Sequence, residues 1–145
     1  MFKKIITTAM IAGLCFTAAP EKGEAATYHI KAINVAKSNL GVPYKYGGIS
    51  PTGFDCSGLI KYAYAKAGKT LPRTAAEMQK KGKTVTAYQS GDLLFYAPNK
   101  ASKATHVGMY VSGGNVINAS SSKGVSYFKT NNRYWKPQFI GAKRI

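Results

Sequence analysis

The chain has 145 residues, with 21 Lys or Arg against five Asp or Glu, and its formal net charge at pH 7 is +16. This length suits one domain with a single hydrophobic core. The few carboxylates leave almost no material for a paired-carboxylate hydrolase or an acidic metal cage, because both need several such groups close together. The excess of positive charge attracts polyanions instead.

Residues 1–25 have the three parts of a secretion signal. Lys3 and Lys4 form its positive start, and the uncharged apolar run 5–19 is shorter than the roughly 20 residues that span a bilayer. Gly23 and Ala25 place small residues where a signal peptidase reads them, which predicts cleavage before Ala26 or just after it. The alternative is a short N-terminal membrane anchor.

Cleavage would leave residues 26–145 as a single domain, expected to be monomeric and secreted. Its net charge would be +15, because the signal carries three lysines and two glutamates. Cys15 would be lost too, and lipid attachment there is disfavoured because Leu14 is bulky. Export argues against nucleic acid as a partner, whereas anionic cell-wall polymers fit both compartment and charge. Alternatively, the lysines only keep an exported protein soluble.

The mature chain begins with patterns typical of helices. The first predicted helix ends at Gly41, and its apolar stripe consists of Ile30, Ile33, Ala36 and Leu40. Glycines and prolines between residues 42 and 53 predict a loop.

Two further helices are expected after the loop. One runs from Cys56 to Gly68, and its buried stripe consists of Leu59, Ile60, Ala63 and Ala67. The other is short, begins with a capping box formed by Thr74 and Glu77, and ends at Gly82.

The second half of the chain changes to strand patterns. Five short runs are rich in β-branched and aromatic residues: 93–96, 106–111, 115–119, 125–128 and 139–143. Helices followed by strands predict an α+β domain, in which the helices pack on one side of an antiparallel sheet.

Cys56 is the leading candidate for chemistry, because it would be the only cysteine of the mature chain. The predicted start of a helix at Cys56, together with a nearby imidazolium, would stabilise a thiolate. Gly58 is expected to leave room for a substrate. The alternative is a buried cysteine that acts as a small hydrophobe, which the polar neighbours Asp55 and Ser57 disfavour.

A thiol nucleophile needs a base, and the mature chain offers His29 and His106. His29 is expected to precede the first helix and to fray with the terminus, whereas His106 opens a strongly patterned strand. His106 is therefore the predicted base. A zinc site is not expected, because one cysteine, two histidines and three acids show no recognised ligand spacing.

Asn118 is the best candidate to orient the imidazole, on one condition. If Gly113-Gly114 formed a regular two-residue hairpin turn, Asn118 would lie opposite Met109, on the other face of the sheet from His106. A longer loop or a β-bulge would shift the register by one and bring Asn118 to the His106 face. We therefore predict a bulge, which the two glycines make easy.

Five motifs occur in the order seen in NlpC/P60 cysteine peptidases, and the chain resembles that family over nearly the whole mature sequence. They are Tyr-Lys-Tyr-Gly-Gly at 44–48, Asp-Cys-Ser-Gly at 55–58, Leu-Pro-Arg-Thr at 71–74, Gly-Asp-Leu-Leu-Phe at 91–95 and His-Val-Gly at 106–108. The resemblance implies a papain-like fold and hydrolysis of peptide bonds in bacterial peptidoglycan without a cofactor.

The resemblance also implies roles for single residues. The nucleophile falls on Cys56, the base on His106 and the third polar residue on Asn118, where many relatives have histidine. Tyr44 matches a hydroxyl at the oxyanion position. Asp55 and Ser57 match positions that contact the free amine of a stem peptide, and Arg73 matches a position that either holds a substrate carboxylate or braces its loop.

The expected function is that of a secreted endopeptidase cutting between D-glutamate and a diamino acid in the stem peptide. An amidase that releases the stem from its sugar is the alternative within the enzyme class. A non-catalytic wall-binding module that adheres through its charge is the alternative outside it. A secreted toxin would use the same chemistry as a housekeeping enzyme.

Overall fold

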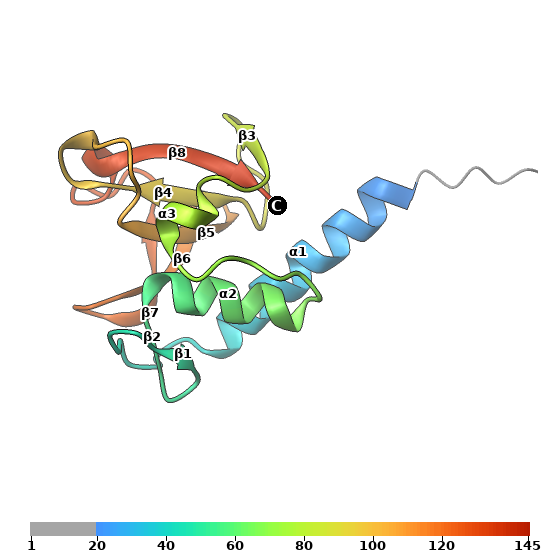
Figure 1. Ribbon diagram of the computed structural model, residues 1–145, viewed down its shortest axis with the longest axis horizontal. Coiled ribbons are helices and arrows are strands. Elements are labelled where there is room, and N and C mark those ends of the chain that lie inside the picture. The colour runs from blue at the N-terminus through green and yellow to red at the C-terminus, as the bar shows by residue number, and fades with distance from the viewer. Residues whose placement is uncertain (1–19) are drawn as a thin grey trace, which may run out of the picture.

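The computed structural model describes residues 20–145, with side chains from residue 27 on, so Cys15 and most of the predicted signal lie outside the described residues. A six-stranded antiparallel sheet has the order β3-β8-β4-β5-β6-β7. Its strands are β3 (Lys83–Val85), β4 (Leu93–Tyr96), β5 (His106–Ser112), β6 (Asn115–Ser120), β7 (Gly124–Lys129) and β8 (Phe139–Arg144). The helices α1 (Pro20–Ser38) and α2 (Cys56–Lys66) lie along one side of it (Figure 1).

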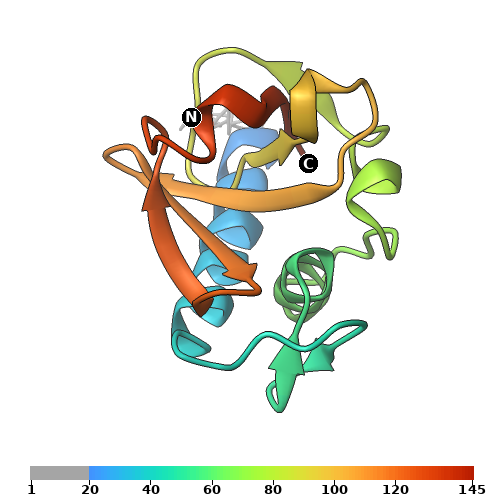
Figure 2. The ribbon, with the colours of Figure 1, turned by 90° about the vertical axis from the view of Figure 1, so that its left-hand side faces the viewer.

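The five predicted strands are confirmed, whereas three short strands carried no recognisable pattern. These are the edge strand β3 and the two strands β1 (Ile49–Ser50) and β2 (Gly53–Phe54), which pair within the predicted loop. The β1–β2 hairpin lies beside α2, on the side away from the large sheet (Figure 2). Two 3₁₀ turns, at Pro98–Lys100 and Lys136–Gln138, complete the connections.

Helix α1 is longer than predicted, and only half of its predicted apolar stripe is buried. It begins at Pro20, so the predicted cleavage point falls inside it. Ile30 and Leu40 were expected in the stripe but are 53% and 43% exposed. Ile33 and Ala36 of the stripe are buried as predicted, and Ala32 is buried with them, on a helix that packs against α2. Leu40 lies beyond the helix end at Ser38, where the helical period no longer applies.

Helix α2 follows the prediction closely. Leu59, Ile60 and Ala63 are fully buried, although Ala67 is only partly so. The helix stops where Gly68 adopts a left-handed conformation (φ 89°), which glycine allows without a Cβ clash. The short helix α3 (Ala75–Met78) begins as expected, with the Thr74 hydroxyl oxygen accepting a hydrogen bond from the Glu77 N–H.

The two faces of the sheet have separate hydrophobic clusters. The face covered by the helices is packed by the main core, and the opposite face carries a smaller cluster that includes Tyr96, Val116 and Phe128. Asp92 is fully buried and paired to Arg144 through two hydrogen bonds of 2.8 Å, which fixes β8 beside β4. Within residues 20–145, no helix has the length and apolar character needed to cross a bilayer.

Candidate active site

Cys56 is the first residue of α2, and the residue before it anchors the helix start. The Asp55 carboxylate accepts a 2.6 Å hydrogen bond from the Gly58 N–H, as an N-cap does. Gly58 does not make room for a substrate, contrary to expectation. A Cβ on Gly58 would lie 1.9 Å from the carbonyl oxygen of Gly48, so the absent side chain lets the preceding loop pack against the helix.

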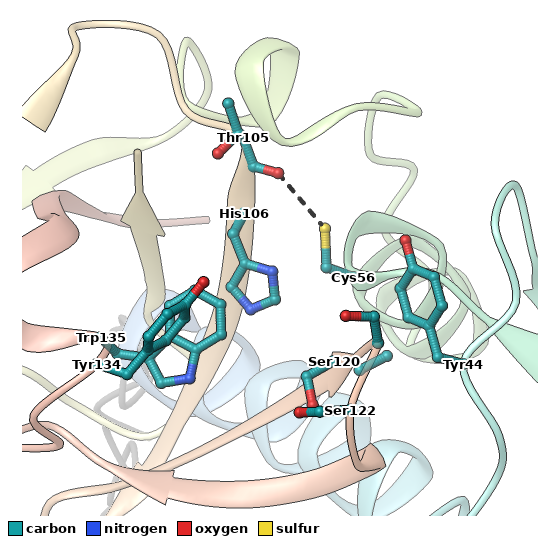
Figure 3. A pocket seen from close by; sticks show the side chains of 10 residues that line it. Tyr44, Cys56, Thr105, His106, Ser120, Ser122, Tyr134 and Trp135 are labelled. Atoms are coloured by element: carbon teal, nitrogen blue, oxygen red, sulfur yellow. Dashed lines mark hydrogen bonds between the residues drawn. The ribbon is translucent and has the colours of Figure 1, made fainter. Parts of the chain in front are cut away.

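His106 and Cys56 line the same cavity, which has a volume of ≈440 Å³. Figure 3 shows the imidazole and the sulfur projecting into it from β5 and from the start of α2. His29 lies elsewhere, and its expected fraying is wrong. It is buried within α1, and its Nε2 lies 2.9 Å from the carbonyl oxygen of Ile145.

Asn118 lies beside His106, with its amide nitrogen 2.9 Å from the imidazole Nε2. The predicted shift of register is present, but in a different place. Gly113 and Gly114 form a regular two-residue turn with positive φ angles, and Ser112 pairs with Asn115 across it. The bulge lies in β5 between Tyr110 and Ser112.

The bulge changes which side chains share a face. On the side of the bulge away from the glycine turn, Met109 pairs with Ile117. The same register sets Asn118 opposite Gly108, which is two residues from His106 and on the same face of the sheet. A Cβ on Gly108 would approach the Asn118 Cβ to 3.5 Å and the Val116 side chain to 2.6 Å. The missing side chain at Gly108 therefore leaves the space through which Asn118 reaches the ring.

Contact with Asn118 engages Nε2 and leaves Nδ1 as the ring nitrogen that can serve Cys56. With the amide nitrogen of Asn118 toward Nε2, the imidazole accepts there and carries its proton on Nδ1. Turning the amide by 180° would present its oxygen to an Nε2–H and free Nδ1 to accept a proton. The amide orientation thus sets the tautomer of the base.

The cysteine and histidine are held as a neutral pair. Burial raises the pKa of the Cys56 thiol, and the nearby Asp55 carboxylate raises it further. The backbone N–H of Val107 lowers this pKa but does not cancel the effect of burial. Burial also lowers the pKa of His106 to about 4. The thiol donates a weak hydrogen bond to the Thr105 carbonyl oxygen, with Sγ and O 4.0 Å apart. The helix start therefore does not produce the resting thiolate that the sequence pattern predicted.

Tyr44 faces Cys56 across the cavity in Figure 3. An isolated backbone bridge to Phe54 fixes its position. Burial, with the nearby Cys56 and Asp55, raises the pKa of the Tyr44 phenol, so the hydroxyl keeps its proton and remains a donor.

Asp55, Ser57 and Arg73 form one network. The Arg73 guanidinium donates to both carboxylate oxygens of Asp55, at 3.1 and 2.6 Å, and to the Ser57 hydroxyl at 2.9 Å. Burial raises the pKa of Asp55, but the hydrogen bonds from Arg73 and the Gly58 N–H outweigh it and hold that pKa below its ordinary value. Of the two roles left open for Arg73, these contacts favour bracing, because they tie the loop before α3 to the start of α2.

Trp135 is the main residue of the site that sequence reasoning missed. Its indole stacks on the His106 ring with centroids 4.1 Å apart and planes 17° from parallel. Phe128 stacks on its indole in turn, and Tyr96 meets it edge-on. Trp135 is the only tryptophan of the chain and stands in a polar segment, which is the signal that could have drawn attention to it.

A second cavity of ≈350 Å³ begins on the other side of Cys56. The two cavities share Tyr44, Cys56 and Thr105, and the second is lined further by Asp55, Ser57 and the start of α3. Cys56 thus lies where two recesses meet.

A cysteine at a helix start, with a histidine and an asparagine on neighbouring strands, is the arrangement that the family resemblance led us to expect. The profile of the NlpC/P60 family matches residues 41–144, and the chain belongs to this family. It is 43% identical over 109 residues to a bifunctional muramidase/DL-endopeptidase of Bacillus subtilis, covering 72% of this chain and 33% of that protein. It is 38% identical over 115 residues to a probable peptidoglycan endopeptidase of the same species, covering 79% and 34%.

The solved structures agree with this assignment. An NlpC/P60 family protein from Bacillus cereus superposes with a TM-score of 0.76 at 33% identity, over 80% of this chain and 39% of that one. The α+β fold with helices on an antiparallel sheet is therefore the fold of the family. The chain spans about a third of the length of each of these two curated relatives.

Proposed function

We propose that residues 26–145 act as a secreted cysteine peptidase that cleaves stem peptides of peptidoglycan between D-glutamate and a diamino acid. The observation that carries the proposal is the convergence of Cys56 and His106 on one cavity, with Asn118 2.9 Å from the far ring nitrogen. The D-glutamyl bond is supported by the DL-endopeptidase activity in the name of a relative.

The first half of the reaction forms a thioester. His106 Nδ1 accepts the thiol proton as Cys56 Sγ attacks the scissile carbonyl carbon, so thiolate and imidazolium exist only during the attack. The oxyanion accepts hydrogen bonds from the backbone N–H of Cys56 and from the Tyr44 hydroxyl. His106 then passes its proton to the departing nitrogen, and the C–N bond breaks.

The second half restores the enzyme. His106 takes a proton from water, whose oxygen attacks the thioester, and the Cys56 thiolate leaves and regains its proton from the imidazolium. Asn118 contributes by fixing the ring, and the orientation that presents its oxygen to Nε2–H is the one that stabilises the imidazolium. Asparagine carries no charge, so it does not raise the basicity of the ring as a carboxylate would.

On the acyl side, we assign Asp55 and Ser57 to the free amine of the stem peptide. Both line the second cavity. Asp55 keeps its charge because its pKa is held low, so an ammonium group finds a carboxylate there. Arg73 acts indirectly, since it holds both side chains in place.

Digestion of soluble muropeptides followed by mass spectrometry tests this proposal. We expect fragments cut after D-glutamate, and no cleavage by a Cys56→Ala variant. Release of an intact stem peptide would instead show an amidase. Binding to purified walls without any fragment from the unmodified protein would show a non-catalytic wall-binding module.

A further inference from the structure

The imidazole of His106 becomes an imidazolium in the proposed reaction, in surroundings that do not favour a charge. Burial lowers its pKa to about 4, and no charge on a described residue offsets this effect. The other titratable groups that line the first cavity are the Cys56 thiol and the phenols of Tyr44 and Tyr134. Tyr96 packs against the ring from β4. Among the described residues, the first cavity therefore has no carboxylate that could stabilise the charged ring.

The charged side chains near the site are engaged elsewhere. Between residues 27 and 145 there are three acids. Asp55 lines the second cavity and not the first, and it is paired with Arg73. Asp92 is buried in an ion pair, and Glu77 is bonded at the start of α3. The cation Lys123 lines an adjoining recess of ≈160 Å³ and not the first cavity itself.

The indole of Trp135 covers one face of the His106 ring. Their centroids lie 4.1 Å apart with planes 17° from parallel, and Figure 3 shows the indole on the side away from Cys56. A parallel stack leaves the edges of the imidazole free, so Nε2 can meet Asn118 while Nδ1 serves Cys56. A cation within about 6 Å of an aromatic centroid is attracted to the π face, most strongly for tryptophan. Tyr96 is less well placed, because its ring is tilted by 57° at 6.1 Å.

Hydrogen bonds hold the segment that carries Trp135. The side-chain oxygen of Asn132 accepts from the backbone N–H groups of Tyr134 and Trp135, at 2.9 and 3.1 Å. The Gln138 N–H donates to the Trp135 carbonyl oxygen at 3.0 Å. The Gln138 carbonyl oxygen accepts from the Ala97 N–H at 2.9 Å, just after β4. Because β4 pairs with β5, the segment is fastened beside the strand that His106 opens.

We propose that Trp135 is a positioning residue, which fixes the plane of the His106 ring and stabilises its imidazolium form through the π face of the indole. This role rests on the proposed function, in which the ring accepts the proton of Cys56. The indole supplies part of the electrostatic stabilisation that a carboxylate would give and that the uncharged Asn118 does not. Loss of the π face should lower kcat/KM about tenfold, which corresponds to ~1.4 kcal/mol and suits a cation–π contact partly removed from water.

Three variants separate the π face from packing. Trp135→Leu keeps an apolar side chain over the ring, and Trp135→Phe keeps a π face. Phe139→Leu is the matched control, because Phe139 belongs to the same cluster and meets the rings of Tyr88 and Tyr96. With soluble muropeptides, we expect kcat/KM to be about tenfold lower for Trp135→Leu, within about threefold for Trp135→Phe and unchanged for Phe139→Leu. Thermal unfolding measures the loss of packing that the two leucine variants share.

Titration of the His106 ring by NMR gives a readout that packing alone would not produce. The resonance is assigned by its absence in His106→Gln, because His29 is also present. In Trp135→Leu the midpoint should lie about one pH unit lower than in the unmodified protein, because the charged ring loses the π face while burial remains. Loss of packing alone would admit water and raise the midpoint toward 6.5. If Trp135→Leu does not fold, Trp135→Phe should show a smaller shift in the same direction.

Two outcomes would overturn the inference while leaving the proposed function intact. One is an unchanged or raised midpoint in the variants of Trp135. The other is an equal change of kcat/KM in Trp135→Leu and Phe139→Leu, which would assign the effect to packing. Absence of cleavage by the unmodified protein would overturn the proposed function, whereas the NMR titration would still decide whether the indole stabilises the imidazolium.

Discussion

The protonation of His106 tests whether the site rests as a neutral thiol and a neutral imidazole. Burial lowers its pKa from 6.5 to about 4, which corresponds to ~3 kcal/mol against the imidazolium at 1.36 kcal/mol per pKa unit. The base must be neutral to accept the thiol proton. We therefore expect kcat/KM to stay level near neutral pH and to fall as the pH falls through about 4.

Trp135 offers a direct readout of this titration. It is the only tryptophan, and it stacks on the His106 ring at 4.1 Å, where an imidazolium should quench its fluorescence. The emission of the native protein should change with a midpoint near pH 4, and a His106→Gln variant should lose that change. Because burial raises the pKa of Cys56, alkylation by iodoacetamide should accelerate about tenfold per pH unit across the neutral range.

The opposite result has a distinct signature. A resting thiolate–imidazolium pair would give an alkylation rate independent of pH between about 5 and 8, with the fluorescence midpoint on the alkaline side. Those two observations together would refute a neutral pair and restore the thiolate expected from the helix start.

Four further predictions follow from named contacts. Between pH 6.5 and 4 the imidazole of His106 binds a proton more readily in the unfolded chain than in the folded one. The free energy of unfolding, measured with urea, should therefore fall by ~3 kcal/mol as the pH falls from 6.5 to 4. The His106→Gln variant should not show this fall. Gly58→Ala should lower the free energy of unfolding by about 1–3 kcal/mol in the same assay, because the added Cβ would meet the Gly48 carbonyl oxygen. Unchanged stability would contradict that packing. Asn118→Ala should lower kcat by about 100-fold with little change in KM, whereas a mainly structural role would lower the melting temperature instead. Retention on purified walls should fall as salt rises beyond about 0.15 M, where charges are screened within roughly 8 Å; salt-insensitive retention would exclude attraction by the basic surface.

Several features of this protein follow from local sequence alone. The five main strands, helix α2 with its glycine stop, and the capped start of α3 were predicted because each depends on periodicity and on caps a few residues long. Cys56 and His106 could be singled out because the predicted mature chain has one cysteine and two histidines, whereas Asn118 was chosen for its place on the strand after the glycine turn and for the family resemblance. The outer strands β1, β2 and β3 were missed because two or three residues carry no measurable period.

Other features depend on contacts between distant segments. Only Ile33 and Ala36 of the predicted α1 stripe are buried, because the packing against α2 decides which side of the helix is covered. The bulge that brings Asn118 beside His106 lies in β5 and not at the glycine turn, and only the pairing of the two strands reveals it. The stacking of Trp135 on the imidazole joins segments 29 residues apart.

The sequence by itself thus determined the kind of chemistry, because a thiol, an imidazole and a carboxamide are properties of residues. Only the tertiary structure decided whether the thiol and the imidazole are charged or neutral. Burial of Cys56 and His106 raises one pKa and lowers the other, and burial arises from packing by β-strands, α2 and Trp135 together. A pattern of neighbours along the chain cannot report how much water the fold removes from a side chain.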